Sequence, residues 1–254
     1  MHWSYGSVLR RALAAGAVVG ILVGAYVYAV VEPTIDAAIA LEEADGASRA
    51  ADDGSRRHDE PLFSRGEQVA GGVAATFITS IVVAAVFGTV YSALRHRVPA
   101  QSDLSRALWL AAVGFLVVAL IPALKYPASP PGVGDPATVG DRTVLYLICL
   151  VASVLITIAL TWLSGILRAR VTDRNRLPAV VIAGIVAYGL LLVLLPAAPG
   201  SAEAAVPAEL VWEFRVRSLG GLALLWLGLG LGLGWLLDHD AHRISNLRAV
   251  PVAR

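Results

Sequence analysis

The sequence predicts an all-α integral membrane protein that crosses the bilayer six times. Its 20 Lys and Arg residues and its 19 Asp and Glu residues all lie outside six long apolar stretches. About 20 helical residues cross a hydrocarbon core of roughly 30 Å, whereas a helix of that length in water needs charges on its exposed face. The predicted spans are residues 12–31, 68–94, 107–124, 143–167, 177–196 and 218–237.

The charges between the spans predict three helical hairpins that open outward, with both termini in the cytoplasm. In this topology the inner segments carry a net charge of +8 and the outer segments a net charge of −7. The inner segments are residues 1–11, 95–106, 168–176 and 238–254, and the outer ones are 32–67, 125–142 and 197–217. Because basic residues resist translocation, we expect one membrane domain over residues 1–254, in the inner membrane of a bacterium.

The first span is predicted to be retained in the mature protein. Arg10 and Arg11 precede an apolar run, as in a signal peptide, but the run of 20 residues is too long. The apolar part of a cleavable signal has roughly 7–15 residues.

The long acidic outer loop, residues 32–67, is predicted to be partly helical and partly flexible. Apolar residues recur at helical spacing from Glu32 to Glu43, with Pro33 at an early position. This pattern predicts either an amphipathic helix on the outer surface or a continuation of the first span. Residues 44–60 are rich in Ala, Gly, Ser, Asp and Arg, and this composition is typical of a flexible segment.

The other two outer loops differ from the first. Residues 125–136 contain four prolines within ten positions, which restrict the unfolded backbone and predict a stiff loop. Residues 207–217 predict a short helix that begins with Pro207 and leads into the last span.

Small residues recur every four positions in three of the spans. These stripes are Ala12, Gly16, Gly20 and Gly24; Thr76, Ser80, Ala84 and Gly88; and the interleaved pairs Gly228/Gly232 and Gly230/Gly234. Helices in lipid associate by close packing, which small residues permit. The stripes therefore predict helix contacts, within one chain or in a homo-oligomer, and a glycine-lined conduit is the alternative.

Three arginines lie at the outer starts of the even-numbered spans: Arg65, Arg142 and Arg217. A cation at a helix N-terminus loses about 0.3–1 kcal/mol, so we expect compensating contacts. The candidates for an outer ion-pair network, to which Lys125 also belongs, are Glu32, Asp36, Glu209 and Glu213. The alternative is that the arginines extend to lipid headgroups.

Metal ligation is predicted, if anywhere, among the outer acidic residues. His58, Asp59 and Glu60 combine imidazole and carboxylate, which suit Co, Ni or Zn, although a solvated linker is the favoured interpretation. The full candidate set is His58, Asp59, Glu60, Glu32, Asp36, Asp135 and Glu209. His239 and His242, beside Asp238 and Asp240, form a second cluster, for which a solvated C-terminal turn is the favoured interpretation.

The spans contain none of the groups that usually drive coupled transport or catalysis. They lack Asp, Glu, Lys, Arg and His, which proton-coupled carriers keep at mid-depth. The single Cys149 allows neither a disulfide framework nor a cysteine metal cluster, and no nucleotide-binding or catalytic motif is present. We expect neither enzymatic activity, nor a tightly bound cofactor, nor nucleic-acid binding, and favour a subunit that needs a partner or forms a passive pathway.

Several loop motifs resemble those of the CbtA family of cobalt transporter subunits. The second hairpin carries IPALKYP at 121–127, PPGVGDP at 130–136 and Arg142-Thr143. The third carries VPAEL at 206–210, Phe214 and Arg217-Ser218, and the first has VEP at 31–33 and Ser64-Arg65-Gly66. The resemblance covers nearly the whole chain. It implies cobalt uptake for cobalamin synthesis with a small single-span partner, CbtB, and a histidine-rich first outer loop, here represented by His58.

The resulting hypothesis is a permease subunit for cobalt or a related divalent cation. The acidic outer surface would gather the ion, and the stiff loop 125–136 with Glu32, Asp36 and Glu209 would form the entrance. The glycine-striped helices would line the passage. The alternative is a non-transporting scaffold or accessory subunit of a larger membrane complex.

Overall fold

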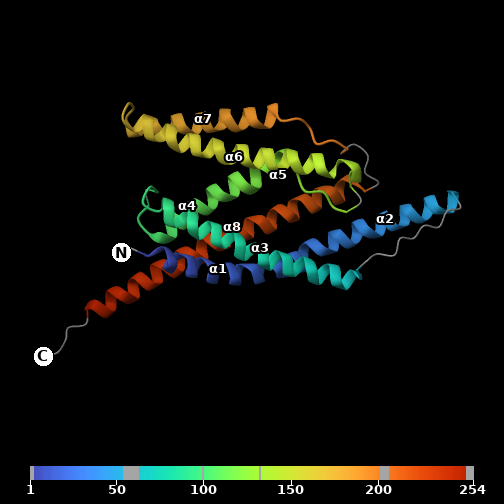
Figure 1. Ribbon diagram of the computed structural model, residues 1–254, viewed down its shortest axis with the longest axis horizontal. Helices are drawn as coiled ribbons and strands as arrows, with labels where there is room; N and C mark the ends of the chain where they lie inside the picture. The colour runs from blue at the N-terminus through green and yellow to red at the C-terminus, as the bar shows by residue number, and fades with distance from the viewer. Residues whose placement is uncertain (1–2, 54–62, 99, 132, 201–205, 250–254) are drawn as a thin grey trace. The chain divides into compact units, whose positions relative to one another are not determined.

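The computed structural model describes residues 3–53, 63–98, 100–131, 133–200 and 206–249. Every regular element in these ranges is a helix (Figure 1). Six helical segments are long and apolar enough to cross a membrane: Tyr5–Ala44, Arg65–Leu94, Asp103–Lys125, Pro136–Arg168, Arg174–Leu194 and Ala208–Ala241. The predicted all-α class and the six apolar helices are confirmed.

The first span continues without a break into the segment 32–67, which was predicted to be an outer loop. α1 (Tyr5–Tyr26) passes through a π-helical turn, η1 (Val27–Val31), into α2 (Glu32–Asp53). Pro33 has no N–H to donate to the preceding turn, and the wider π turn accommodates this. Of the two sequence alternatives, continuation is therefore confirmed. Residues 44–53, predicted to be flexible, are helical, and residues 54–60 lie outside the described ranges.

In the second and third spans, too, the helix start and the irregular turn follow from the local sequence. α3 (Arg65–Leu94) begins with a capping box, in which Ser64 and Glu67 satisfy each other's backbone N–H groups. The third span is α4 (Asp103–Gly114), a π-helical stretch η2 (Phe115–Leu120) and α5 (Ile121–Lys125). Here again the π-helical stretch directly precedes a proline, Pro122.

The last three spans are longer than their apolar cores. A short 3-10 turn, η3 (Pro136–Thr138), leads into α6 (Val139–Arg168), which is followed by α7 (Asp173–Leu194). α8 runs from Ala208 to Ala249. The predicted helix at 207–217 is thus the start of α8. The favoured turn around His239 and His242 was wrong, because α8 continues through both residues.

The helices group into two compact units. Unit 1 comprises Met1–Pro33, Arg56–Gly114 and Gly220–Arg254, and therefore holds α1, α3, α4 and most of α8. Unit 2 comprises Thr34–Ser55 and Phe115–Leu219, and holds most of α2 together with α5, α6, α7 and the start of α8. The apolar stretches alone do not indicate this grouping.

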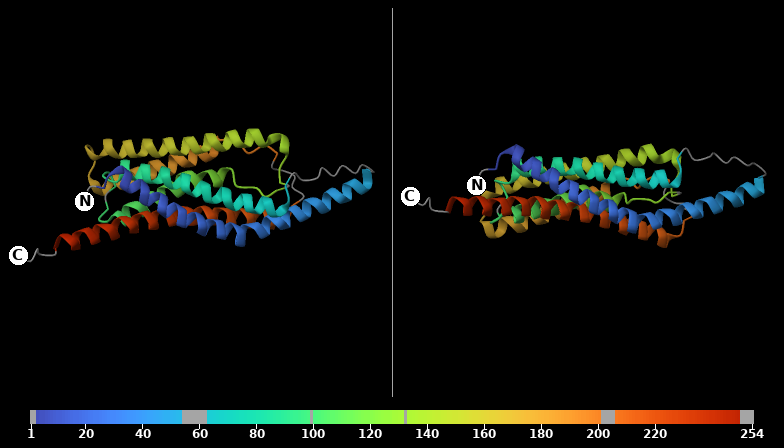
Figure 2. Two further views of the ribbon diagram at one scale, coloured as in Figure 1. Left: turned by 60° about the horizontal axis from the view of Figure 1, so that its bottom comes forward. Right: turned by 90° about the horizontal axis from the view of Figure 1, so that it is seen from below.

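In unit 1 the small-residue stripes form the helix contacts. A Cβ on Gly16 would lie 2.4 Å from the Cβ of Ala84, and one on Gly88 would lie 2.6 Å from that of Ala12. α1 and α3 therefore pack backbone to backbone and antiparallel, as Figure 2 also shows. This favours the predicted packing role of these stripes over a conduit between α1 and α3.

The glycines of α8 divide between two neighbours within unit 1. A Cβ on Gly228 or Gly232 would meet Val19 or Ala15 of α1. A Cβ on Gly230 or Gly234 would meet the helix α4, at 2.8 Å and 2.6 Å respectively. The two interleaved stripes thus serve two different helix faces. Between them, the leucines of α8 fill the core with α1 and α3; they are Leu225, Leu229, Leu233 and Leu237.

Unit 2 is built on the antiparallel pair α6 and α7, with α5 packed against both. Its small core consists of Ile121, Tyr126 and Cys149, covered by partly buried side chains that include Tyr146 and Tyr188. The Tyr126 hydroxyl donates to the Pro196 carbonyl oxygen at 2.8 Å, which ties the end of the third span to the end of α7.

Candidate functional site

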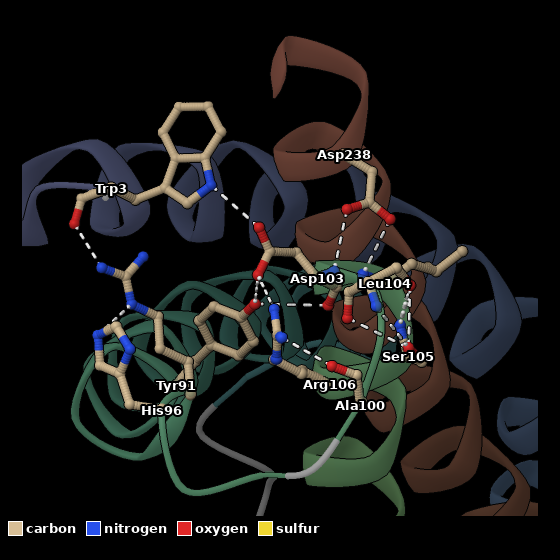
Figure 3. A network of polar contacts seen from close by, with 11 residues as sticks. Trp3, Tyr91, His96, Ala100, Asp103, Leu104, Ser105, Arg106 and Asp238 are labelled. Carbon is tan, nitrogen blue, oxygen red and sulfur yellow. Dashed lines mark hydrogen bonds and ion pairs between the residues drawn. The ribbon is translucent and has the colours of Figure 1, made fainter. Parts of the chain in front are cut away.

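The densest polar cluster of the described chain lies at one end of unit 1 and centres on Asp103 (Figure 3). Its carboxylate accepts hydrogen bonds from the Trp3 indole at 3.0 Å, the Tyr91 hydroxyl at 2.7 Å and the Arg106 guanidinium at 3.0 Å. Such donors stabilise the ionised carboxylate in a partly buried position. Trp3 precedes α1, Tyr91 ends α3 and Asp103 begins α4, so this one side chain connects three helices.

Asp238 attaches α8 to the same point. Its carboxylate accepts the backbone N–H groups of Asp103 at 3.0 Å and Leu104 at 3.1 Å. The first N–H groups of a helix have no partner within the helix. A carboxylate from another helix thus caps α4, with a favourable charge for its N-terminus.

Two arginines complete this cluster, which we call the Asp103 network. Arg11 donates to the Asp240 carboxylate at 2.9 Å, and its guanidinium lies 4.6 Å from the centre of the Trp3 ring. Arg95 donates to the Trp3 carbonyl oxygen at 2.8 Å. The start of α1, the end of α3, the start of α4 and the last turns of α8 therefore lie at one end of the unit.

The sequence analysis did not predict the Asp103 network. The second candidate cluster, His239 and His242 beside Asp238 and Asp240, is not arranged as a metal site in the described residues. Asp238 and Asp240 contact α4 and α1, whereas His239 stacks on Trp235 with ring centres 5.2 Å apart. The side chain of His242 lies outside the described part. The available sequence signal was the presence of two acidic residues, Asp103 and Asp238, in strongly basic segments that were predicted to be cytoplasmic.

At the other end of unit 1, Glu32 forms an ion pair with Arg65. Glu32 is only 8% exposed, and among the described residues it is the one Asp, Glu, Lys, Arg or His that is buried. It begins α2, and Arg65 begins α3, where a cation is unfavourable without compensation. The predicted compensation of Arg65 by Glu32 is thus observed.

The two other arginines also have partners, both within unit 2. Arg217 pairs with Glu213 one turn earlier on α8. Arg142 lies against Gly134, where any Cβ would come 2.4 Å from its guanidinium, and it donates a long 3.4 Å bond to the Asp135 carbonyl oxygen. Gly134 has a φ of +97°, which explains why glycine occupies this turn. Lys125 ends α5, where a positive charge is favourable to the helix dipole.

The predicted metal ligands are not gathered into a cluster in the described residues. His58, Asp59 and Glu60 lie outside those residues. Asp36 and Glu209 are exposed, and the Asp135 carboxylate caps η3 by accepting the Ala137 N–H at 2.9 Å. No group of three His, Cys, Asp or Glu side chains in the described ranges is arranged to hold a metal ion. The ligand role of this set stays a prediction.

Six apolar helices, with charges confined to their ends, define a multi-pass membrane protein. A family model described as "Probable cobalt transporter subunit (CbtA)" matches residues 5–238, and the chain belongs to this family. The resemblance of the loop motifs is thereby confirmed, and a transporter subunit agrees with the predicted absence of catalysis. No curated protein and no solved structure gives a significant match.

Proposed function

We propose that this protein is the main membrane subunit of an uptake system for cobalt, or a related divalent cation, that supplies cobalamin synthesis. The observation that carries the proposal is the family match, which extends from the start of α1 to Asp238 and so includes all six spans. The subunit lies in the inner membrane of a bacterium and works with a small membrane partner.

The proposed topology has three outward-opening hairpins and both termini in the cytoplasm. The charge difference between the two sets of loops supports it, because basic segments stay on the cytoplasmic side. The Asp103 network gives independent support. It joins the N-terminal segment, the link between α3 and α4 and the end of α8, three segments predicted to lie on the same side.

The outer end of unit 1 is the proposed place where the cation first meets the protein. The negative outer segments raise the local concentration of cations. Glu32 then offers a carboxylate whose side chain is 10% exposed, beside the Arg65 side chain, which is 35% exposed. An arriving divalent cation competes with Arg65 for this carboxylate. His58, Asp59 and Glu60 are the proposed capture residues upstream of it.

A partner is part of the proposal because the predicted spans carry no Asp, Glu, Lys, Arg or His for energy coupling. The family description, a transporter subunit, is consistent with such an assembly. The partner's contribution would be the coupling that this chain lacks.

The test is the accumulation of radioactive cobalt in cells that carry the chain and its small partner, compared with a deletion strain. We expect deletion to reduce accumulation at low external cobalt and to make cobalamin synthesis depend on added cobalt. Glu32→Gln should reduce uptake at low cobalt concentration, whereas Glu43→Gln, an exposed residue of the same helix, should not. Unchanged accumulation with intact cobalamin synthesis, and stoichiometric recovery of the chain in a metal-free complex, would instead identify a scaffold.

A further inference from the structure

Basic residues gather where the antiparallel helices α6 and α7 are joined, within unit 2 (Figure 1). α6 ends at Arg168 and α7 begins at Asp173, so the short connection places basic residues of both helices at the same end of the pair. The segment 168–176 carries one acidic residue, Asp173, and a net charge of +3. Its arginines are Arg168, Arg170, Arg174 and Arg176.

Three of these arginines, Arg168, Arg170 and Arg174, are exposed, and we call them the α6–α7 arginine cluster. Their guanidinium groups form no hydrogen bond or ion pair with the side chains that the structure describes. The Asp103 network of unit 1 is different, because Arg11 and Arg106 are paired there with carboxylates of the same chain. The charge of the α6–α7 arginine cluster is therefore directed to the surroundings of the protein.

Apolar side chains next to the cluster also face the surroundings. Trp162, six residues before Arg168, is 71% exposed, and Leu177, three residues after Arg174, is 69% exposed. Six helical residues correspond to about 9 Å along the helix axis. An exposed tryptophan at this distance from a charged helix end is typical of the boundary between hydrocarbon and headgroups. The helix surface beside Trp162 therefore suits acyl chains, and the arginine cluster lies at the depth of the headgroups.

We propose that the α6–α7 arginine cluster binds the headgroup phosphates of anionic phospholipids, whose acyl chains lie along the exposed faces of α6 and α7. A guanidinium group stays charged and donates paired hydrogen bonds to phosphate oxygens. Clusters of basic residues at the cytoplasmic ends of membrane helices recognise anionic lipids, and the segment 168–176 is predicted to be cytoplasmic. A free anion would contact the arginines alone, whereas a lipid also covers Trp162 and Leu177. The inference does not depend on the transport of a cation.

The test measures tryptophan fluorescence of the full-length protein in phosphatidylcholine vesicles that contain dibrominated phosphatidylglycerol or, for comparison, dibrominated phosphatidylcholine. Bromine on the acyl chains quenches nearby tryptophans. The part of the quenching that is lost in Trp162→Phe therefore reports the lipids beside the cluster. We expect phosphatidylglycerol to bind there about fivefold more tightly than phosphatidylcholine, or better, because one basic residue near an anionic surface contributes about this factor.

Two double variants with the same change in charge locate the effect. Arg168→Gln combined with Arg174→Gln should remove the preference for phosphatidylglycerol. Arg10→Gln combined with Arg97→Gln, at exposed positions of unit 1, should keep it. Equal losses in the two double variants would show that net charge attracts the lipid, and would overturn the site. Equal quenching by the two lipids in the unaltered protein would also overturn it, as would a preference that Trp162→Phe leaves unchanged.

Inorganic phosphate distinguishes a lipid headgroup from a soluble anion. Added phosphate and sodium chloride at equal ionic strength screen the arginines equally, so both should weaken the preference for phosphatidylglycerol to the same extent. If phosphate removes the preference and sodium chloride does not, the cluster is a site for a free anion, and the lipid assignment is wrong.

Discussion

The two units hold their helices together in opposite ways. In unit 1 the helices approach through glycine and alanine, and the charged side chains of the Asp103 network are paired at the helix ends. In unit 2 the pair α6 and α7 has few close backbone contacts. A Cβ on Gly184 would meet one leucine methyl group at 3.3 Å, and one on Gly165 or Gly189 would meet nothing within 4 Å.

This difference in packing predicts that the helices of the two units separate at different free-energy cost. Buried interfaces account for 39% of the apolar window of the first span, but for 11% of that of α6 and 6% of that of α7. Segments with few buried contacts open at lower free-energy cost. We therefore interpret unit 1 as the rigid part and the α6–α7 pair as the part whose helices separate more easily.

The largest effect is expected from a glycine-to-leucine substitution in unit 1, and the same substitution in unit 2 is the comparison. Gly16→Leu places a side chain where even a Cβ would be 2.4 Å from Ala84, and overpacking of this kind costs about 3 kcal/mol or more. Gly189→Leu adds an apolar side chain at an exposed position of α7 and should be tolerated. Thermal unfolding in detergent, followed by circular dichroism, measures both. Equal losses for the two variants would contradict the difference in packing.

A smaller but still large effect is expected at the Asp103 network. Asp103→Asn removes a carboxylate that accepts from Trp3, Tyr91 and Arg106, and buried donors left without an acceptor cost about 1–3 kcal/mol. Tyr91→Phe removes one of those donors, so the Asp103→Asn loss should be smaller in the Tyr91→Phe background. A double-mutant cycle on the unfolding free energy tests this coupling. Strictly additive effects would mean that the two residues stabilise the unit independently.

The helices could be predicted from the sequence because lipid leaves few alternatives. A chain that must satisfy its backbone inside a bilayer forms helices, and the charges mark where each helix leaves it. The end of α8 was less predictable. Its apolar run stops at Leu237, yet the helix continues to Ala249, and Asp238 and Asp240 contact α4 and α1 along the way.

Among the candidate sites, too, some contacts could be predicted from the local sequence and others could not. The pairing of Arg65 with Glu32 followed from local reasoning, since a cation at a helix start needs a partner. The Asp103 network did not, because Trp3 and Asp238 are 100 and 135 residues away from Asp103 in the sequence. The surroundings of Ser153 could not be predicted either. Ser153 and Thr157 differ little in sequence context, and only the structure shows that the Thr157 hydroxyl donates to a carbonyl oxygen whereas that of Ser153 lies beside the Cys149 thiol.

The smallest expected effects are the changes in unfolding free energy when two buried serines are each replaced by alanine. Ser80→Ala removes a hydroxyl that donates to the Thr76 carbonyl oxygen at 2.8 Å and should change the unfolding free energy by well under about 1 kcal/mol. Ser153→Ala removes a hydroxyl that donates to no carbonyl oxygen and whose neighbour is the weakly hydrogen-bonding Cys149 thiol, so it should leave the unfolding free energy unchanged or raise it by up to about 1 kcal/mol. Thermal unfolding of both variants without metal provides the measurement. If Ser153→Ala instead lowers stability by more than Ser80→Ala does, the Ser153 hydroxyl contributes more to folding than a hydroxyl that donates to a carbonyl oxygen, and the expected difference between the two serines is wrong.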